Sequence, residues 1–199
     1  HAGDVLDRPD PRLRPLARSE RLPRALLVAI TALLVTAVGR LGWAFFTEQL
    51  TWRYVAEQSR LDAPWPYRVA GTWAGMEGSL LLFAAIVGIV AVIAQRGGRG
   101  TPLTRWTAVA TVGALGVIDL TLASPFGRLD APALRGFGMN PILEHPAMTA
   151  HPPLLYLGVA MAFAAALRAA SDAHAPFAAA RPWLLATIAP TPMKKLCIA

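Results

Sequence analysis

Two histidines precede an apolar run in the stretch NPILEHPAMTAHPPLLYLG, residues 140–158. A neutral imidazole can bind a metal ion, and histidine is a common axial ligand of haem iron. Pro152 disfavours a helical conformation for His151, whereas a proline pair suits the first turn of a helix. We therefore expect His151 just outside a helix, where the positive end of the helix dipole favours the neutral ring.

Two interpretations of His151 stay open at this point. The residue could hold a metal, or it could cap the helix and lie at a membrane interface. His145 lies in the same loop without a comparable setting, so a structural role is the expectation there. The sole cysteine, Cys197, cannot form an internal disulfide, and no cysteine motif predicts a zinc site.

A second candidate is WAGMEGS, residues 73–79. Gly75 and Gly78 permit close approach of the backbone to another helix or to a flat ligand. Glu77 and Ser79 suit a helix N-terminus. An ordinary helix start needs the same residues, so simple packing is the alternative interpretation.

Transmembrane helices must position these residues. Of 199 residues, 55% are hydrophobic, and the mean hydropathy is +0.44, as is typical of a membrane protein. A spanning helix needs about 20 apolar residues, and four segments approach this length: residues 25–46, 79–95, 106–123 and 153–170. A fifth, residues 183–189, stops at Pro190 before it could cross. We predict an all-α polytopic transmembrane bundle of four spans plus a truncated fifth helix.

Basic residues predict the orientation of this bundle. The 19 Lys and Arg exceed the 12 Asp and Glu, but they cluster between apolar runs, which indicates topology signals and no nucleic-acid partner. Eleven arginines lie in the leader 1–24, in the link 96–105 and near the end of the fourth span (Arg168 and Arg181), against five in loops 47–78 and 124–152. We expect a cytoplasmic leader, a bundle over residues 25–189 with both long loops outside, and an aberrant tail at residues 190–199.

Arg40 and Asp119 lie at similar depth in the first and third spans. Ionised groups there are costly unless they are paired or face water. We expect the two side chains to pair. The alternative is that Arg40 points outward and Asp119 meets a hydroxyl or water.

Together, the motifs resemble the CcmF and NrfE family of cytochrome c haem lyases. The matching stretches are WAGMEGSLLLF at residues 73–83 and NPILEHPAMTAHPPLLYLG at residues 140–158. A looser likeness extends to YVAEQS at residues 54–59 and SPFGRL at residues 124–129. Their order and spacing also agree with the family.

The resemblance implies a bacterial inner-membrane protein that acts in cytochrome c maturation. Such a protein takes haem from a periplasmic haem chaperone and delivers it to apocytochrome c, together with other membrane subunits of the maturation complex. By this resemblance, His151 is a periplasmic axial ligand of the haem iron. The other residues expected at the haem site are Trp73, Gly75, Glu77, Gly78 and Tyr156.

The chain also departs from the family pattern. After Trp183 the family continues into a further span, a tryptophan-rich haem-handling segment and additional haem-ligating histidines, which are not found here. We therefore expect a fragment that is inactive by itself. Two other classes stay open: a small membrane transporter or channel component, with Arg40 and Asp119 as pathway residues, and a structural membrane protein without a ligand.

Overall fold

The computed structural model describes residues 13–59, 63–96 and 100–171, and the regular elements in these ranges are all helices. The four long ones are α1 (Leu13–Phe46), α4 (Met76–Ala94), α5 (Pro102–Thr121) and α6 (Pro146–Ser171). The short ones are α2 (Arg53–Gln58), α3 (Trp65–Ala70), η1 (Gly71–Trp73) and η3 (Pro141–Glu144). All four long helices are long and apolar enough to cross a membrane, which confirms the predicted fold. The expected fifth helix, residues 183–189, lies outside the described residues.

The membrane-spanning segments are Arg21–Phe46, Met76–Ala94, Pro102–Thr121 and Thr149–Ser171, and each begins a few residues before its predicted start. Local capping explains such a shift. In α5, Thr101 Oγ1 accepts a hydrogen bond from the Thr104 N–H at 3.3 Å, with Pro102 in the first turn. These are common helix start signals. Helix α1 begins still earlier, at Leu13, inside the expected leader.

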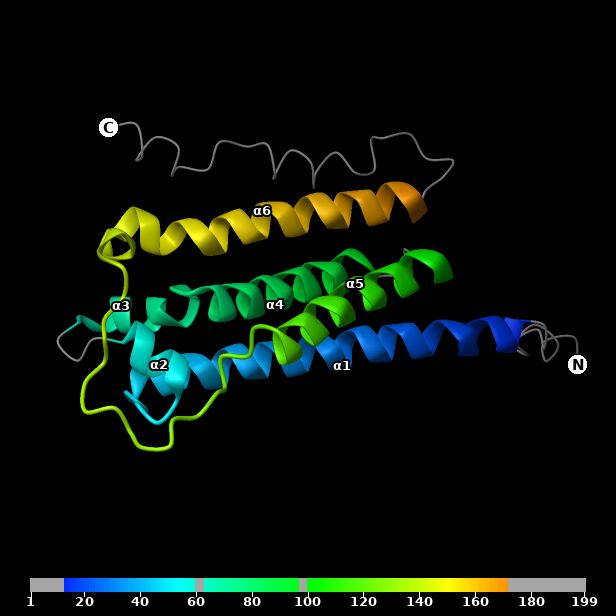
Figure 1. Cartoon of the computed structure of the whole chain (residues 1–199). Coiled ribbons are helices and arrows are strands. Elements are labelled where there is room, and N and C mark those ends of the chain that lie inside the picture. The colour runs from blue at the N-terminus through cyan, green and yellow to red at the C-terminus, as the bar shows by residue number, and fades with distance from the viewer. Residues whose placement is uncertain (1–12, 60–62, 97–99, 172–199) are drawn as a thin grey trace, which may run out of the picture.

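The long helices lie side by side and alternate in direction (Figure 1). The loop between α1 and α4 and the loop between α5 and α6 therefore lie at one end of the bundle, called here the loop end. The link between α4 and α5 lies at the opposite end. This agrees with the predicted grouping of the two long loops on one side.

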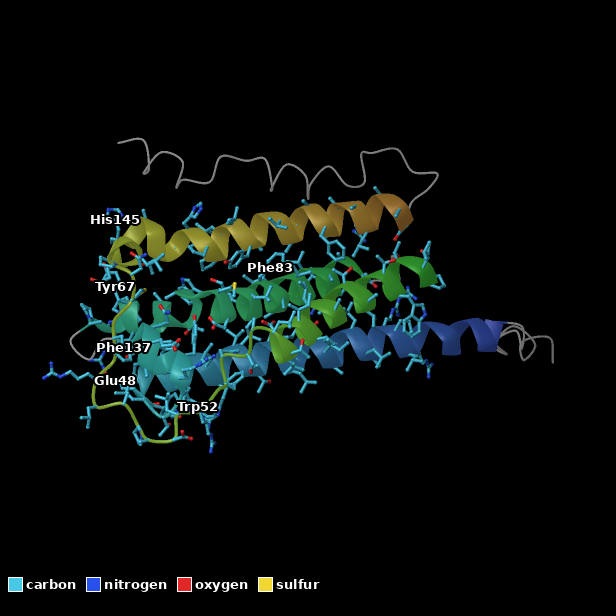
Figure 2. All side chains as sticks on the ribbon, viewed as in Figure 1. Glu48, Trp52, Tyr67, Phe83, Phe137 and His145 are labelled. Atoms are coloured by element: carbon cyan, nitrogen blue, oxygen red, sulfur yellow. The ribbon has the colours of Figure 1, made fainter. Side chains whose placement is uncertain are left out.

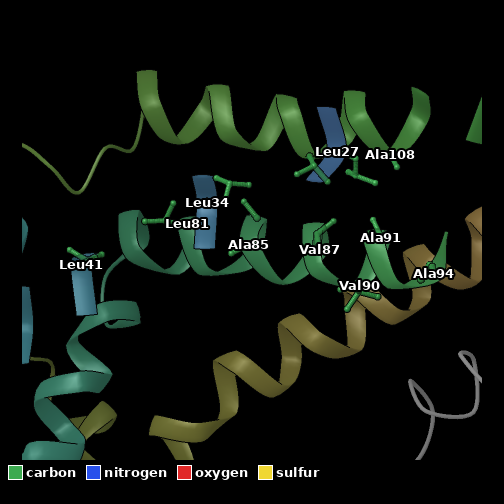
Figure 3. Close-up of a cluster of buried hydrophobic side chains, with 14 of the residues drawn as sticks. Leu27, Leu34, Leu41, Leu81, Ala85, Val87, Val90, Ala91, Ala94 and Ala108 are labelled. Atoms are coloured by element: carbon green, nitrogen blue, oxygen red, sulfur yellow. The ribbon is translucent and has the colours of Figure 1, made fainter. Parts of the chain in front are cut away.

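A seam between α1 and α4 forms much of the core. Leu27, Leu34 and Leu41 recur every seven residues on α1 and are buried in one hydrophobic cluster with alanines and valines of α4 (Figure 3). The two helices approach closely where both side chains are small. A Cβ atom at Gly88 would lie 2.6 Å from Thr31 Oγ1. Close packing of small residues is a major source of helix association in lipid.

Helix α6 is fastened along the length of α4. The Phe83 and Tyr156 rings meet edge to face, with centroids 5.4 Å apart. At the far end, Arg168 Nη1 donates to the Ala94 carbonyl at 3.0 Å. Ala94 is the last residue of α4, where carbonyls lack intrahelical donors. These contacts fix both the depth and the rotation of α6.

The two long loops pair with each other at the loop end. The Leu129 N–H donates to the Thr51 carbonyl at 2.9 Å, next to an isolated β-bridge between Trp52 and Arg128. The Arg128 guanidinium lies 4.8 Å from the centre of the Trp52 ring, a cation–π contact. Further backbone hydrogen bonds join Ala133 to Leu50, Arg53 to Gly127, Phe137 to Ala56 and Gly138 to Ser59. Figure 2 shows Trp52 and Phe137 at this end of the bundle.

Candidate functional site

The prediction that His151 precedes its helix is wrong. Helix α6 begins at Pro146, so His151 lies in its second turn and Pro152 lies inside the helix. The reason is an earlier cap: His145 Nδ1 accepts a hydrogen bond from the Ala147 N–H at 3.2 Å. This cap outweighs the bias that a proline imposes on the residue before it. The helix-terminus setting predicted for His151 is therefore absent, because the helix dipole acts mainly within the first turn.

The capping contact also gives His145 a structural role, as expected from the sequence. Its side chain is exposed at the loop end, where Figure 2 labels it. Since the ring accepts a backbone N–H, replacing it with alanine would disturb the first turn of α6. Asparagine is the better control substitution, because its side-chain oxygen can also cap a helix.

The His151 side chain is exposed near the loop end of α6. In the described part of the chain, no group forms a hydrogen bond or an ion pair with its ring, which leaves both ring nitrogens available to a ligand. Tyr156 lies five residues later and is half-buried, with its ring against Phe83 of α4. The structure thus presents His151 outward while Tyr156 packs inward.

The WAGMEGS motif packs against the side chain of Tyr54 and forms a hydrogen bond with its hydroxyl. This oxygen accepts a hydrogen bond from the Gly75 N–H at 2.9 Å and lies 3.3 Å from the Gly71 carbonyl oxygen. A Cβ atom at Gly75 would lie 2.8 Å from the Tyr54 ring, and one at Gly78 would collide with the Thr72 carbonyl oxygen. Close packing therefore explains both glycines. Their contact with haem stays a prediction.

Burial disfavours ionisation of the Tyr54 hydroxyl. It raises the pKa of this group above its usual value of 10.0, and the nearby Glu77 carboxylate raises it further. The hydrogen bond from Gly75 acts in the opposite direction but does not offset burial. Glu77 itself is half-buried in the first turn of α4, where the helix dipole favours a carboxylate.

Trp73 joins the two motifs. Its indole Nε1 donates a hydrogen bond to the Thr149 carbonyl at 2.9 Å. The Trp73 carbonyl in turn accepts from Ser79 Oγ at 2.8 Å, which ties η1 to the start of α4. Thr149 precedes His151 by two residues. The structure thereby brings the WAGMEGS motif next to the turn that carries His151.

The predicted ion pair between Arg40 and Asp119 is wrong. Asp119 is 3% exposed, and in the described ranges neither of its carboxylate oxygens has a hydrogen-bond partner. Arg40 is exposed and directly precedes the buried Leu41 on α1. Because successive helical residues are rotated by about 100°, Arg40 points away from the seam that contains Leu41. The outward orientation of Arg40, the alternative interpretation, is the one observed.

The described part of the loop end offers few side chains that could bind a metal or the iron of haem. Among the described residues, no cluster of three or more His, Cys, Asp or Glu could hold a metal ion. Haem needs less, because the porphyrin supplies the equatorial nitrogens and the protein supplies axial ligands. A single exposed imidazole with free ring nitrogens fits one axial position. His151 meets this requirement.

Two residues of this arrangement, Tyr54 and Thr149, were not predicted from the sequence. Tyr54 lies in the looser matching stretch YVAEQS, and its proximity to Gly75 and Gly78 arises only in the folded chain. A signal for Thr149 was available. Pro153 lies four residues later and lacks the N–H that would normally bond to the Thr149 carbonyl.

Comparisons with known proteins give consistent relatives, although no family profile and no solved structure matches the chain. It is 36% identical over 165 residues to the cytochrome c-type biogenesis protein ccl1 of Rhodobacter capsulatus, a match that covers 77% of this chain. It is 35% identical over 166 residues, again 77% of the chain, to the cytochrome c-type biogenesis protein CcmF of Pseudomonas aeruginosa. The "Probable cytochrome c-type biogenesis protein NrfE" of Escherichia coli is 34% identical over 137 residues, or 66% of the chain. The chain spans about a quarter of the length of these relatives.

Proposed function

Over the matched part of its length, this chain belongs to the CcmF and NrfE family of cytochrome c-type biogenesis proteins, and we propose that it handles haem in bacterial cytochrome c maturation. One observation carries the proposal. The exposed His151 ring has no competing hydrogen bond in the described structure and lies beside the Trp73 motif. The names of the relatives favour this role over that of a membrane transporter or channel component.

In this proposal, His151 supplies one axial ligand to the iron of a haem that is passed on to apocytochrome c. Tyr156 packs inward and fixes the rotation of the helix that carries the ligand. Gly75 and Gly78 keep the start of α4 close to Tyr54, which holds Trp73 and Glu77 at the same end of the bundle.

The proposed partners follow from this role. The complete protein receives haem from a periplasmic haem chaperone, delivers it to apocytochrome c and works with other membrane subunits of the maturation complex. This requires the loop end to face the periplasm and the N-terminal leader to lie on the cytoplasmic side of the inner membrane. The arginine distribution supports that orientation.

Cysteine labelling in intact cells tests the orientation. After the change Cys197→Ser, single cysteines are introduced by Ala131→Cys at the loop end and by Gly98→Cys in the link between α4 and α5. A membrane-impermeant thiol reagent is expected to label the first variant, and the second only after lysis. Labelling of both from outside, or of the second alone, contradicts the orientation.

Complementation tests the function. A chimaera in which this chain replaces the matching quarter of Pseudomonas aeruginosa CcmF is expressed in a strain without CcmF, and covalent haem in c-type cytochromes is measured. We expect the chimaera and its His145→Asn control to form cytochrome and the His151→Ala variant to fail, at equal amounts in the membrane. Equal cytochrome yields from all three proteins would reject the assignment.

A further inference from the structure

The two prolines in the interior of α6, Pro152 and Pro153, leave two backbone carbonyls without their usual donors. In an α-helix, the N–H of each residue donates to the carbonyl four residues earlier, and proline has no N–H. Pro152 therefore offers no donor to Met148, and Pro153 offers none to Thr149. Both carbonyls lie where α6 enters its spanning part, which begins at Thr149. Lipid provides no replacement donor, so proline is tolerated there only when neighbouring groups satisfy the backbone.

Trp73 provides the replacement for one of these carbonyls. The distance of 2.9 Å from its Nε1 to the Thr149 oxygen is that of a good hydrogen bond. The donor comes from η1, which is 76 positions away in the sequence. This hydrogen bond therefore replaces a missing helical hydrogen bond and also connects α6 to the start of α4.

Other contacts hold both ends of this bond in place. On the donor side, Ser79 Oγ donates to the Trp73 carbonyl at 2.8 Å. On the acceptor side, the Thr149 N–H donates to the His145 carbonyl at 2.9 Å, and Thr149 Oγ1 donates to the Leu143 carbonyl at 2.7 Å. The hydrogen bond thus connects two fixed segments and can transmit their position to the following turn.

We propose that Trp73 is a positioning residue for His151. Trp73 acts by replacing the backbone donor that Pro153 lacks. His151 follows Thr149 by two residues, about half a helical turn. Any displacement of the Thr149 carbonyl therefore also displaces the imidazole. Trp73 acts through the backbone of α6 and without touching haem. The consequence for haem binding rests on the proposed function, whereas the replacement of the missing donor does not.

Three substitutions isolate this hydrogen bond. Trp73→Phe keeps an aromatic ring but removes the N–H. Pro153→Ala returns a backbone N–H to the Thr149 carbonyl and removes the need for Trp73. Pro152→Ala is the matched control, because it returns an N–H to the Met148 carbonyl instead.

The CcmF chimaera is titrated with haemin in detergent, and haem absorbance is recorded. We expect Trp73→Phe to weaken binding about tenfold, the effect of one lost hydrogen bond. The second change Pro153→Ala should restore most of the affinity, and Pro152→Ala should not. Restoration by neither change, or by both equally, would overturn the positioning role and leave direct contact between Trp73 and haem as the explanation of the loss.

The His151→Ala variant of the chimaera separates the two proposals. If it binds haem normally, the proposed ligand is wrong, and the replacement of the missing donor is then judged from thermal unfolding of the 199-residue chain. There, Trp73→Phe should lower the midpoint or the yield of folded protein, and only Pro153→Ala should recover it. Equal recovery by Pro152→Ala would refute the replacement of the donor itself.

Discussion

The Tyr54 hydroxyl oxygen accepts a hydrogen bond from the Gly75 N–H at 2.9 Å, and this contact joins α2 to the residue that caps α4. Tyr54 is 2% exposed, so its hydroxyl has little access to water. The start of α4 is thus built around a side chain 21 positions earlier in the sequence. Only glycine fits at residues 75 and 78, because the Tyr54 side chain and η1 occupy the space that a Cβ atom would need.

Alanine at Gly78 is expected to destabilise the bundle by about 1–3 kcal/mol or more, because its Cβ atom would collide with the Thr72 carbonyl oxygen and the Tyr54 hydroxyl. Gly39→Ala is the matched control, since no atom lies within 4 Å of a Cβ atom at that position. Thermal unfolding in detergent should give a lower midpoint for Gly78→Ala and an unchanged or higher one for Gly39→Ala. Similar midpoints for the two variants would contradict this packing.

The neutral Tyr54 hydroxyl is expected to make stability depend on pH in the alkaline range. Burial raises its pKa in the folded state above the usual value of 10.0, so the unfolded chain releases this proton first. The contribution is full below about pH 10 and declines as the pH rises further. Tyr54→Phe should lower the free energy of unfolding at neutral pH by about 1–2 kcal/mol. Tyr54→Phe should also reduce the loss of stability at alkaline pH, measured as the unfolding midpoint against pH. An unchanged slope above about pH 10 would contradict the contribution of the Tyr54 hydroxyl.

Asp119→Asn is expected to leave the stability unchanged or to raise it by about 1–2 kcal/mol, because it removes an unpaired carboxylate from a spanning helix. Arg40 is exposed and makes no ion pair with it. The effects of Arg40→Leu and Asp119→Asn should therefore add in a double-mutant cycle. A coupling energy above about 0.5 kcal/mol, or a clear loss of stability in Asp119→Asn alone, would restore the ion-pair interpretation.

Sequence patterns predicted the depth of each helix better than its rotation. The four spans follow from apolar length, because every backbone group in lipid must be satisfied within a helix. Matching depth led to the wrong pairing of Arg40 with Asp119. The seven-residue recurrence of Leu27, Leu34 and Leu41 contained the missing information, since it identifies the buried face of α1.

At the candidate site, too, some features were predicted from the sequence and others were not. The two motifs were recognised from sequence, and the structure places them in contact through Trp73 and Thr149. The local conformation at His151 was not predicted, because the rule for residues before proline describes an average preference. In this chain the His145 cap and the Trp73 hydrogen bond together support a helix through both prolines.

The absorbance spectrum of haem bound to the purified CcmF chimaera tests the central claim most directly, since axial ligation determines the iron spectrum. We expect a ligated spectrum for the unchanged chimaera and for His145→Asn, loss of its His151-dependent part in His151→Ala, and return of that part when free imidazole is added to His151→Ala. The same haem content and spectrum in His151→Ala without imidazole would contradict the assignment of His151 as a haem ligand.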